Sequence, residues 1–239
     1  MITGYWNLFE ICNLGFVFFG FMEIIPTVIA KDFSEVKAKI KKAEPFFDWL
    51  QLDIMGGKFV ANKTWQRPKD LLKLKTKLKL EAHLMVANPE QAVGGWLDAG
   101  VQRIIVHWEA VVRVGVEAQH IVFLQKMIDQ VKSQQKEFGL ALNPETPVDI
   151  LTDWLTQIDL MLLMTVRPGQ GGQEFMPKVL PKITQLRQVW PDGKIGVDGG
   201  IDLESAKQCV QAGANILSVG SALWQADDLG QVARLFKGI

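Results

Sequence analysis

Three ionisable side chains stand in apolar segments that have the composition of β-strands. Gln51 and Asp53 are two residues apart in the run WLQLDIM, so both side chains point to the same face of a strand. His83 lies in LEAHLMV, and Asp198 ends KIGVD. A buried carboxylate needs a hydrogen-bonding partner or a metal ion. Two opposed carboxylates suit a reaction that removes a proton from one face of a substrate carbon and returns it on the other.

The same side chains could hold a metal, because imidazole and carboxylate groups together bind divalent cations well. Glycines follow three later segments: GQGG at 169–172, DGG at 198–200 and GS at 220–221. Such loops can turn backbone N–H groups around an anion, which predicts a phosphate site. The alternatives are a polar layer satisfied by hydrogen bonds in a protein core, and plain turns in which glycine supplies a positive φ.

Strands that alternate with helices must position these residues. The predicted strands are Glu23–Ile29, Trp49–Met55, Leu80–Val86, Arg103–His107, Gly139–Leu142, Leu160–Val166, Lys194–Val197 and Ile216–Val219. The predicted helices are Phe33–Ala43, Pro89–Ala99, Ala118–Lys136, Val179–Val189 and Leu203–Ala212. Eight such units predict a single (β/α)8 barrel, in which functional groups lie at the carboxyl ends of the strands. An open doubly wound sheet is the alternative, but no G-x-G-x-x-G follows the first strand.

Composition narrows the classes of function. The 239 residues contain 26 Lys+Arg and 26 Asp+Glu, a balance that argues against a nucleic-acid partner. With only 2 Cys the chain has no disulfide framework, which favours a cytoplasmic location. The domain prediction is a barrel over residues 22–239 and an N-terminal hydrophobic extension over 1–21. That extension has neither the pattern of a signal peptide nor the length of a membrane span, so we expect no membrane partner and treat a start-site artefact as one explanation.

Seven segments, in order along the chain, resemble the ribulose-phosphate 3-epimerase family. They are PTVIAKDF (26–33), WLQLDIMGGKFVANKT (49–64), EAHLMVANPE (81–90), LALNPETP (140–147), LLMTVRPGQGGQEF (162–175), VDGGI (197–201) and AGANILSVGSALW (212–224). The resemblance implies a cytoplasmic (β/α)8 enzyme of the pentose phosphate pathway. Such an enzyme interconverts D-ribulose 5-phosphate and D-xylulose 5-phosphate by two-base proton transfer at C3, through an enediolate stabilised by one divalent metal ion.

The resemblance also implies roles for individual residues. Asp53 matches the catalytic base and Asp198 matches its partner acid, and both also match metal ligands together with His83. The positions that match substrate or phosphate contacts are Thr27, His83, Gly169, Gln170, Gly171, Gly172, Gly199, Gly200, Gly220 and Ser221. Met55, Met85 and Met164 match apolar residues that line the site, although core packing explains them nearly as well.

The departures from the family pattern concern the metal and the loops. Gln51 replaces a histidine ligand, and its neutral amide oxygen predicts a weak or lost ligand that penalises Zn²⁺ more than Mn²⁺ or Mg²⁺. The identity of the metal, among Zn, Fe, Mn and Co, is therefore open. Gly56 replaces an aspartate, Ala61 a proline and Gln170 a phenylalanine. Arg167 replaces an asparagine, and it either reaches the phosphate or points into solvent.

Two rival functions stay open at this point. One is another phosphosugar enzyme, either a 3-epimerase that acts on a hexulose 6-phosphate, which would use the same residues, or a hexulose-phosphate synthase. The other is a catalytically impaired phosphosugar-binding protein, against which the retention of both aspartates argues. The partner in each case is a phosphosugar, and association into a homo-oligomer is left open.

Overall fold

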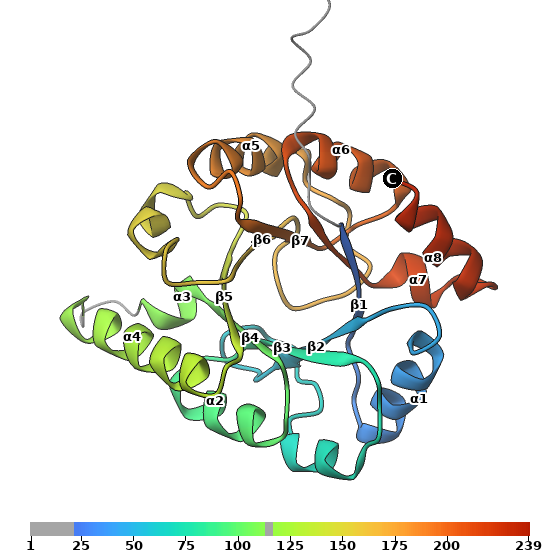
Figure 1. Cartoon of the computed structure of the whole chain (residues 1–239), viewed down its shortest axis with the longest axis horizontal. Coiled ribbons are helices and arrows are strands. Elements are labelled where there is room, and N and C mark those ends of the chain that lie inside the picture. Colours follow the sequence, from blue (N-terminus) through green and yellow to red (C-terminus); the bar gives the residue numbers. More distant parts are fainter. Residues whose placement is uncertain (1–21, 113–116) are drawn as a thin grey trace, which may run out of the picture.

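A computed structural model describes residues 22–112 and 117–239, which form one closed barrel of parallel strands in the order β1 to β8 (Figure 1). The strands are β1 Glu23–Val28, β2 Trp49–Met55, β3 Lys79–Met85, β4 Arg103–His107, β5 Glu137–Leu142, β6 Leu160–Met164, β7 Lys194–Asp198 and β8 Ile216–Val219. The α-helices are α1 Phe33–Ala43, α2 Pro89–Asp98, α3 Trp108–Val111, α4 Glu117–Ser133, α5 Leu180–Val189, α6 Leu203–Ala212, α7 Ser221–Trp224 and α8 Leu229–Lys237. The predicted (β/α)8 barrel is confirmed. The predicted extension over 1–21 lies outside the described residues.

All eight predicted strands are present, and their ends differ from the prediction by at most two residues. The largest differences are at β5, which begins at Glu137, and at β6, which ends at Met164. The connections before β3 and before β6 contain 3₁₀ helices, Pro68–Lys73 and Asp149–Trp154, where no helix was predicted. Proline at the first position of one and the short length of both suit the tighter 3₁₀ turn.

Local signals start the helices where the sequence predicts. The Asp32 side chain accepts a hydrogen bond from the backbone N–H of Glu35 and caps α1. Asp202 caps α6 through the N–H groups of Glu204 and Ser205, and the Ser205 hydroxyl accepts from the N–H of Asp202 in return. These caps fix the residues at which α1 and α6 begin.

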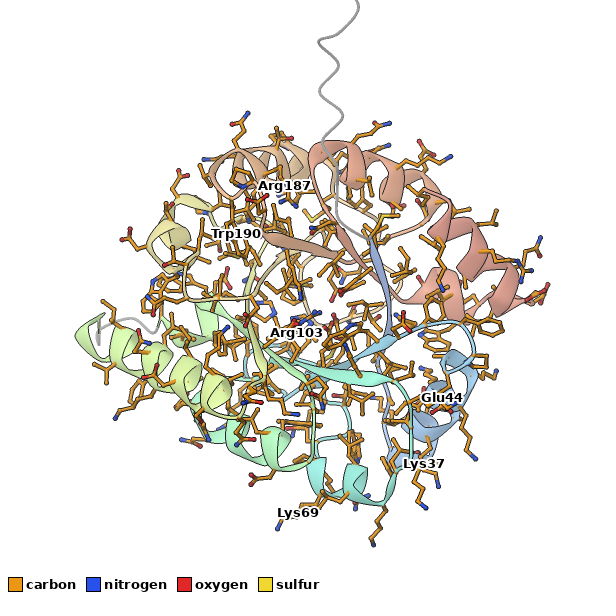
Figure 2. All side chains as sticks on the ribbon, viewed as in Figure 1. Lys37, Glu44, Lys69, Arg103, Arg187 and Trp190 are labelled. Carbon is orange, nitrogen blue, oxygen red and sulfur yellow. The ribbon has the colours of Figure 1, made fainter. Side chains whose placement is uncertain are left out.

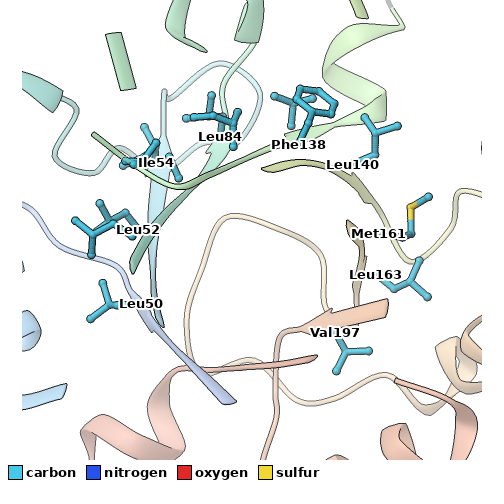
Figure 3. Packing of buried hydrophobic residues seen from close by; sticks show 14 of the residues in the cluster. Leu50, Leu52, Ile54, Leu84, Phe138, Leu140, Met161, Leu163 and Val197 are labelled. Carbon is cyan, nitrogen blue, oxygen red and sulfur yellow. The ribbon is translucent and has the colours of Figure 1, made fainter. Parts of the chain in front are cut away.

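Alternate residues of each strand face opposite sides of the barrel wall. Figure 3 shows side chains that lie outside the ring of strands, where they contact the helices: Leu50, Leu52, Ile54, Leu84, Phe138, Leu140, Met161, Leu163 and Val197. A second buried apolar cluster fills the interior and consists of Ile25, Trp49, Ile105, Ala141, Leu160, Leu162, Met164 and Ile216. The interior is therefore packed, as in other (β/α)8 barrels.

A buried arginine lies at the amino ends of the strands. Arg103, at the start of β4, is 0% exposed and lies near the barrel axis (Figure 2). Its guanidinium donates to Glu81 at 2.6 Å and to Glu137 at 2.7 Å, and it is 3.5 Å from Glu23. The guanidinium also stacks on Trp49, with 4.1 Å between the guanidinium carbon and the ring centroid. These contacts close the end of the barrel opposite the predicted site.

None of the helices within the described ranges combines the length and the apolar character that a membrane crossing demands.

Candidate active site

Asp53, His83 and Asp198 meet inside the barrel at the carboxyl ends of β2, β3 and β7. One potential ligand atom of each lies within 4.8 Å of those of the other two. His83 Nδ1 is 3.1 Å from Asp53 Oδ1 and 3.4 Å from Asp198 Oδ2. All three side chains are buried. Their convergence follows from parallel strands, whose carboxyl ends meet at one mouth of the barrel.

Gln51 completes this cluster with its amide nitrogen, whereas the sequence predicted that its amide oxygen would lie there. Its amide nitrogen, Nε2, donates to Asp53 Oδ1 at 2.7 Å and to Asp198 Oδ2 at 2.7 Å. The same nitrogen lies 3.2 Å from His83 Nδ1. The amide oxygen faces away and accepts a hydrogen bond from the Ser218 hydroxyl at 3.0 Å. An N–H donor, and not the predicted amide oxygen, therefore lies among the three ionisable groups.

The electrostatics of the cluster follow from burial and close approach. Burial raises the pKa of Asp53 and the nearby Asp198 charge raises it further, although hydrogen bonds from His83 and Gln51 oppose the shift. Burial alone would lower the pKa of His83, but hydrogen bonds to Asp198 and Asp53 and their charges raise it to about 9. His83 is thus charged at neutral pH in this arrangement, and it balances one of the two carboxylates.

A second histidine orients the first. His83 Nε2 is 2.9 Å from His107 Nε2, so one of the two nitrogens must carry the shared proton. Burial lowers the pKa of His107 to about 4, which keeps this ring neutral. We infer that His83 donates and His107 accepts, which leaves the proton of His107 on Nδ1, 3.6 Å from Glu109 Oε2. His107 is completely buried in this contact.

A cavity of about 290 Å³ opens above this cluster. Asp53 and Asp198 reach its floor, while His83 and Gln51 lie beneath. The other residues proposed from the sequence that line it are Thr27, Met55, Met85, Met164, Gly169, Gln170, Gly171, Gly172, Gly199, Gly200, Gly220 and Ser221. The structure therefore brings the whole predicted set to one cavity or to the layer directly below it.

Close contacts leave no room for a side chain at two of the glycines at the mouth. Gly200 has φ +65°, and a Cβ there would stand 2.5 Å from the backbone nitrogen of Phe175. A Cβ at Gly220 would stand 2.9 Å from the Thr27 hydroxyl. The loop that follows β6 is held by Gln173, which donates to the carbonyl oxygens of Arg167 and Gln170. The loop after β7 thus packs against the loop after β6, and glycines of all three loops line the same cavity, an arrangement suited to a small anion.

The positive charge at this cavity comes from a residue that the sequence analysis did not single out. Arg167 is exposed and pairs with Glu145 at 3.2 Å, and it does not line the cavity. Among the described lining residues, Lys39 of α1 is the only Lys, Arg or His. Its Nζ donates to the carbonyl oxygen of Ile29 at 3.1 Å, pairs with Glu35 at 2.9 Å and lies 5.7 Å from the centre of the Trp224 ring.

Sequence signals for the missed residues differ in strength. Ser218 is a polar residue in the otherwise apolar strand ILSV, and its place two residues after Ile216 puts it on the interior face. That pattern could have identified it. Lys39 belongs to a helix with several other lysines, and nothing in the sequence distinguishes it from them.

The remaining departures lie away from the ionisable cluster. Gly56 forms an isolated bridge with Lys63, next to a separate shallow pocket beside Val86. Ala61 is exposed. Only Gln170 among the loop replacements lines the main cavity.

Comparison with known proteins points to one family. A sequence model described as "Ribulose-phosphate 3 epimerase family" matches residues 23–224. A ribulose-phosphate 3-epimerase of Synechocystis sp. is 37% identical over 214 residues, which is 87% of this chain and 90% of the relative. The ribulose-phosphate 3-epimerase of Bacillus subtilis is 35% identical and covers 87% of this chain and 94% of its own. A chloroplastic ribulose-5-phosphate-3-epimerase of Arabidopsis thaliana is 34% identical, covering 90% and 75% respectively.

Solved structures with much lower identity share the fold alone. A 3-hexulose-6-phosphate synthase from Salmonella typhimurium superposes with a TM-score of 0.67 at 17% identity, over 91% of this chain and 97% of that one. An orotidine 5′-phosphate decarboxylase from Pyrococcus horikoshii gives 0.58 at 17% identity, over 90% and 97%.

Proposed function

Because the chain belongs to the ribulose-phosphate 3-epimerase family, we propose that it interconverts D-ribulose 5-phosphate and D-xylulose 5-phosphate. The observation that supports this most directly is the pair of carboxylates, Asp53 and Asp198, which come from β2 and β7 and reach the floor of one cavity. A 3-epimerase must remove the C3 proton from one face of the sugar and supply a proton to the other. Two carboxylates that come from different strands and line the same cavity can do both.

In this proposal the two aspartates exchange roles with the direction of reaction. The ionised carboxylate takes the C3 proton and becomes neutral, while the protonated partner gives its proton to the opposite face of the enediolate. One carboxyl of the pair must therefore be protonated at neutral pH. The raised pKa of Asp53, caused by burial and by the Asp198 charge, favours that state.

The donor set also suits a divalent metal, since one imidazole nitrogen and two carboxylates are ligands that such ions accept. We propose that Asp53, His83 and Asp198 hold it. The ion would stabilise the negative charge that develops on the substrate oxygens. The chain's own part is to orient His83 through His107 and to keep both carboxylates at the cavity.

The sugar phosphate is proposed to lie between the glycine loops, with Lys39 as its cation. Replacement of Lys39 with methionine keeps the aliphatic stem and removes the charge. A charge-assisted hydrogen bond contributes about 1.5–3 kcal/mol. We therefore expect kcat/KM for ribulose 5-phosphate to fall about 10-fold or more, mainly through KM. Lys42→Met, an exposed lysine on the same helix, is the matched control and should leave KM unchanged. An unaltered KM in Lys39→Met would exclude this role.

The direct test of the activity is exchange of the C3 proton in deuterium oxide. Purified protein with Mn²⁺, Zn²⁺ or Fe²⁺ is incubated with ribulose 5-phosphate, and both incorporation of deuterium and formation of xylulose 5-phosphate are followed by NMR. We expect both signals. Exchange only with a hexulose 6-phosphate would move the assignment to the longer sugar, and no exchange with any of these metals would favour a phosphosugar-binding protein.

A further inference from the structure

Gln51 fills the centre of the proposed ligand group with a hydrogen-bond donor. A metal ion and an amide N–H both seek the same carboxylate oxygens, Asp53 Oδ1 and Asp198 Oδ2, and each oxygen lies only 2.7 Å from Gln51 Nε2. Nitrogen of a neutral amide carries no lone pair available for a cation. An ion bound by the three ligands must therefore displace Nε2 from its present position.

The side chain is held in this position by its own hydrogen bonds. Gln51 is 0% exposed, and both of its amide hydrogens have a carboxylate acceptor. Hydrogen bonds to ionised groups are stronger than those between neutral groups, so displacing Nε2 has a substantial cost. Without a metal ion, the amide also places its positive edge between the carboxyl groups of Asp53 and Asp198.

Ser218 gives the amide a partner in either of two orientations. At present the Ser218 hydroxyl donates to Gln51 Oε1 at 3.0 Å. A hydroxyl can also accept, so a half-turn of the amide about its terminal bond would direct Nε2 to Ser218 and Oε1 to the ligand group. The half-turned amide faces both carboxylates with its oxygen, which is unfavourable unless a cation lies between them.

We propose that Gln51 is an internal competitor of the metal: its amide nitrogen occupies the ligand group when no ion is bound, and the ion enters only when the amide is displaced. This inference rests on the metal role proposed above. It reverses the expectation for truncation of Gln51. If Gln51 were a weak ligand, its removal would weaken metal binding, whereas removal of a competitor strengthens it.

The decisive experiment is direct binding of Mn²⁺, measured by electron paramagnetic resonance and calorimetry on the full chain without substrate. We expect Gln51→Ala to bind Mn²⁺ at least about 10-fold more tightly than the wild type, because the ion no longer displaces charge-assisted hydrogen bonds and water can enter the vacated volume. Gln51→His, which replaces the donor with a ligand, should also bind more tightly. Gln134→Ala, an exposed glutamine after α4, should match the wild type. Weaker binding by Gln51→Ala with tighter binding by Gln51→His would overturn the proposal.

A second measurement on the wild type keeps the test independent of whether Gln51→Ala folds. In ¹⁵N-labelled protein with EDTA, the Gln51 side-chain amide, assigned from its absence in Gln51→His, should be protected from hydrogen exchange. Saturating Zn²⁺ should shift this signal. An amide that exchanges freely and does not respond to Zn²⁺ contradicts the proposal. Neither measurement uses turnover, so failure here and failure of the epimerase assignment give different results.

Discussion

Asp53→Asn and Asp198→Asn should each lower kcat for epimerisation by about 10²–10⁴-fold, the contribution usual for a positioned acid or base. Asparagine has the shape of aspartate but cannot accept the C3 proton. The two carboxylates lie at one cavity and serve opposite faces of the sugar in the proposed mechanism, so neither can replace the other. Asp98→Asn, at the exposed end of α2, is the control and should retain full activity.

Deuterium exchange separates this two-base mechanism from simple loss of the metal. Each variant keeps the base for one epimer. One variant should therefore still wash out the C3 proton of ribulose 5-phosphate, and the other should do so only for xylulose 5-phosphate, although neither forms the opposite epimer at a normal rate. A loss of exchange with both epimers in both variants would indicate that the substitutions act through the metal. If one variant exchanges the C3 proton of both epimers equally, the aspartate that was replaced in that variant is not a base.

Arg103→Met should lower the free energy of unfolding by about 3–5 kcal/mol, because it leaves Glu81 buried without its cation. The two partners are 0% and 1% exposed at their side chains, so water cannot take the place of the guanidinium. Denaturant unfolding followed by circular dichroism measures the loss. Lys194→Met is the control, since Lys194 pairs with Glu137 at 2.9 Å but is 38% exposed. It should cost at most about 1 kcal/mol.

The loss of stability in Arg103→Met should also depend on pH, and the direction of that dependence follows from Glu81. Burial already raises the pKa of Glu81, while the Arg103 charge and hydrogen bond oppose that shift. Without Arg103 the folded-state pKa rises further above the unfolded value. A group of this kind stabilises the fold at low pH, and the stabilisation is lost as the pH rises through the folded-state pKa. The difference in the free energy of unfolding between the wild type and Arg103→Met should therefore become smaller on acidification. The double variant Glu81→Gln/Arg103→Met should not show this pH dependence. A deficit that grows on acidification would be inconsistent with a buried, unpaired Glu81.

Local patterns predict the architecture of this chain because each strand and helix carries its own signal. The period-two placement of Gln51 and Asp53 puts both in the barrel interior, and the helices capped by Asp32 and Asp202 begin at the predicted residues. The closed barrel then brings Asp53, His83 and Asp198 together without further information. The position of the site in the barrel can therefore be predicted from the strand pattern.

The orientations and partners of individual side chains could not be predicted from the sequence, because they depend on contacts between distant parts of the chain. The direction of the Gln51 amide depends on Ser218, which lies 167 positions later, and on the carboxylates that its nitrogen joins. Lys39 lines the cavity while Arg167 pairs with Glu145, a choice made by the fold around each side chain. The enclosure of Arg103 by residues from β1, β3 and β5 likewise appears only in three dimensions.

The Arg103 network and the carboxylate pair lie toward opposite ends of the barrel interior, and Glu81, which is two residues from His83 on β3, is the member of the network nearest to the site. Substitutions at distant sites without shared partners have additive free energies. Substitutions at Glu23 and Glu137, the partners of Arg103 on β1 and β5, can thus change thermal tolerance while the reaction chemistry stays the same. Heat resistance and catalysis are in this sense two separately adjustable traits of one domain.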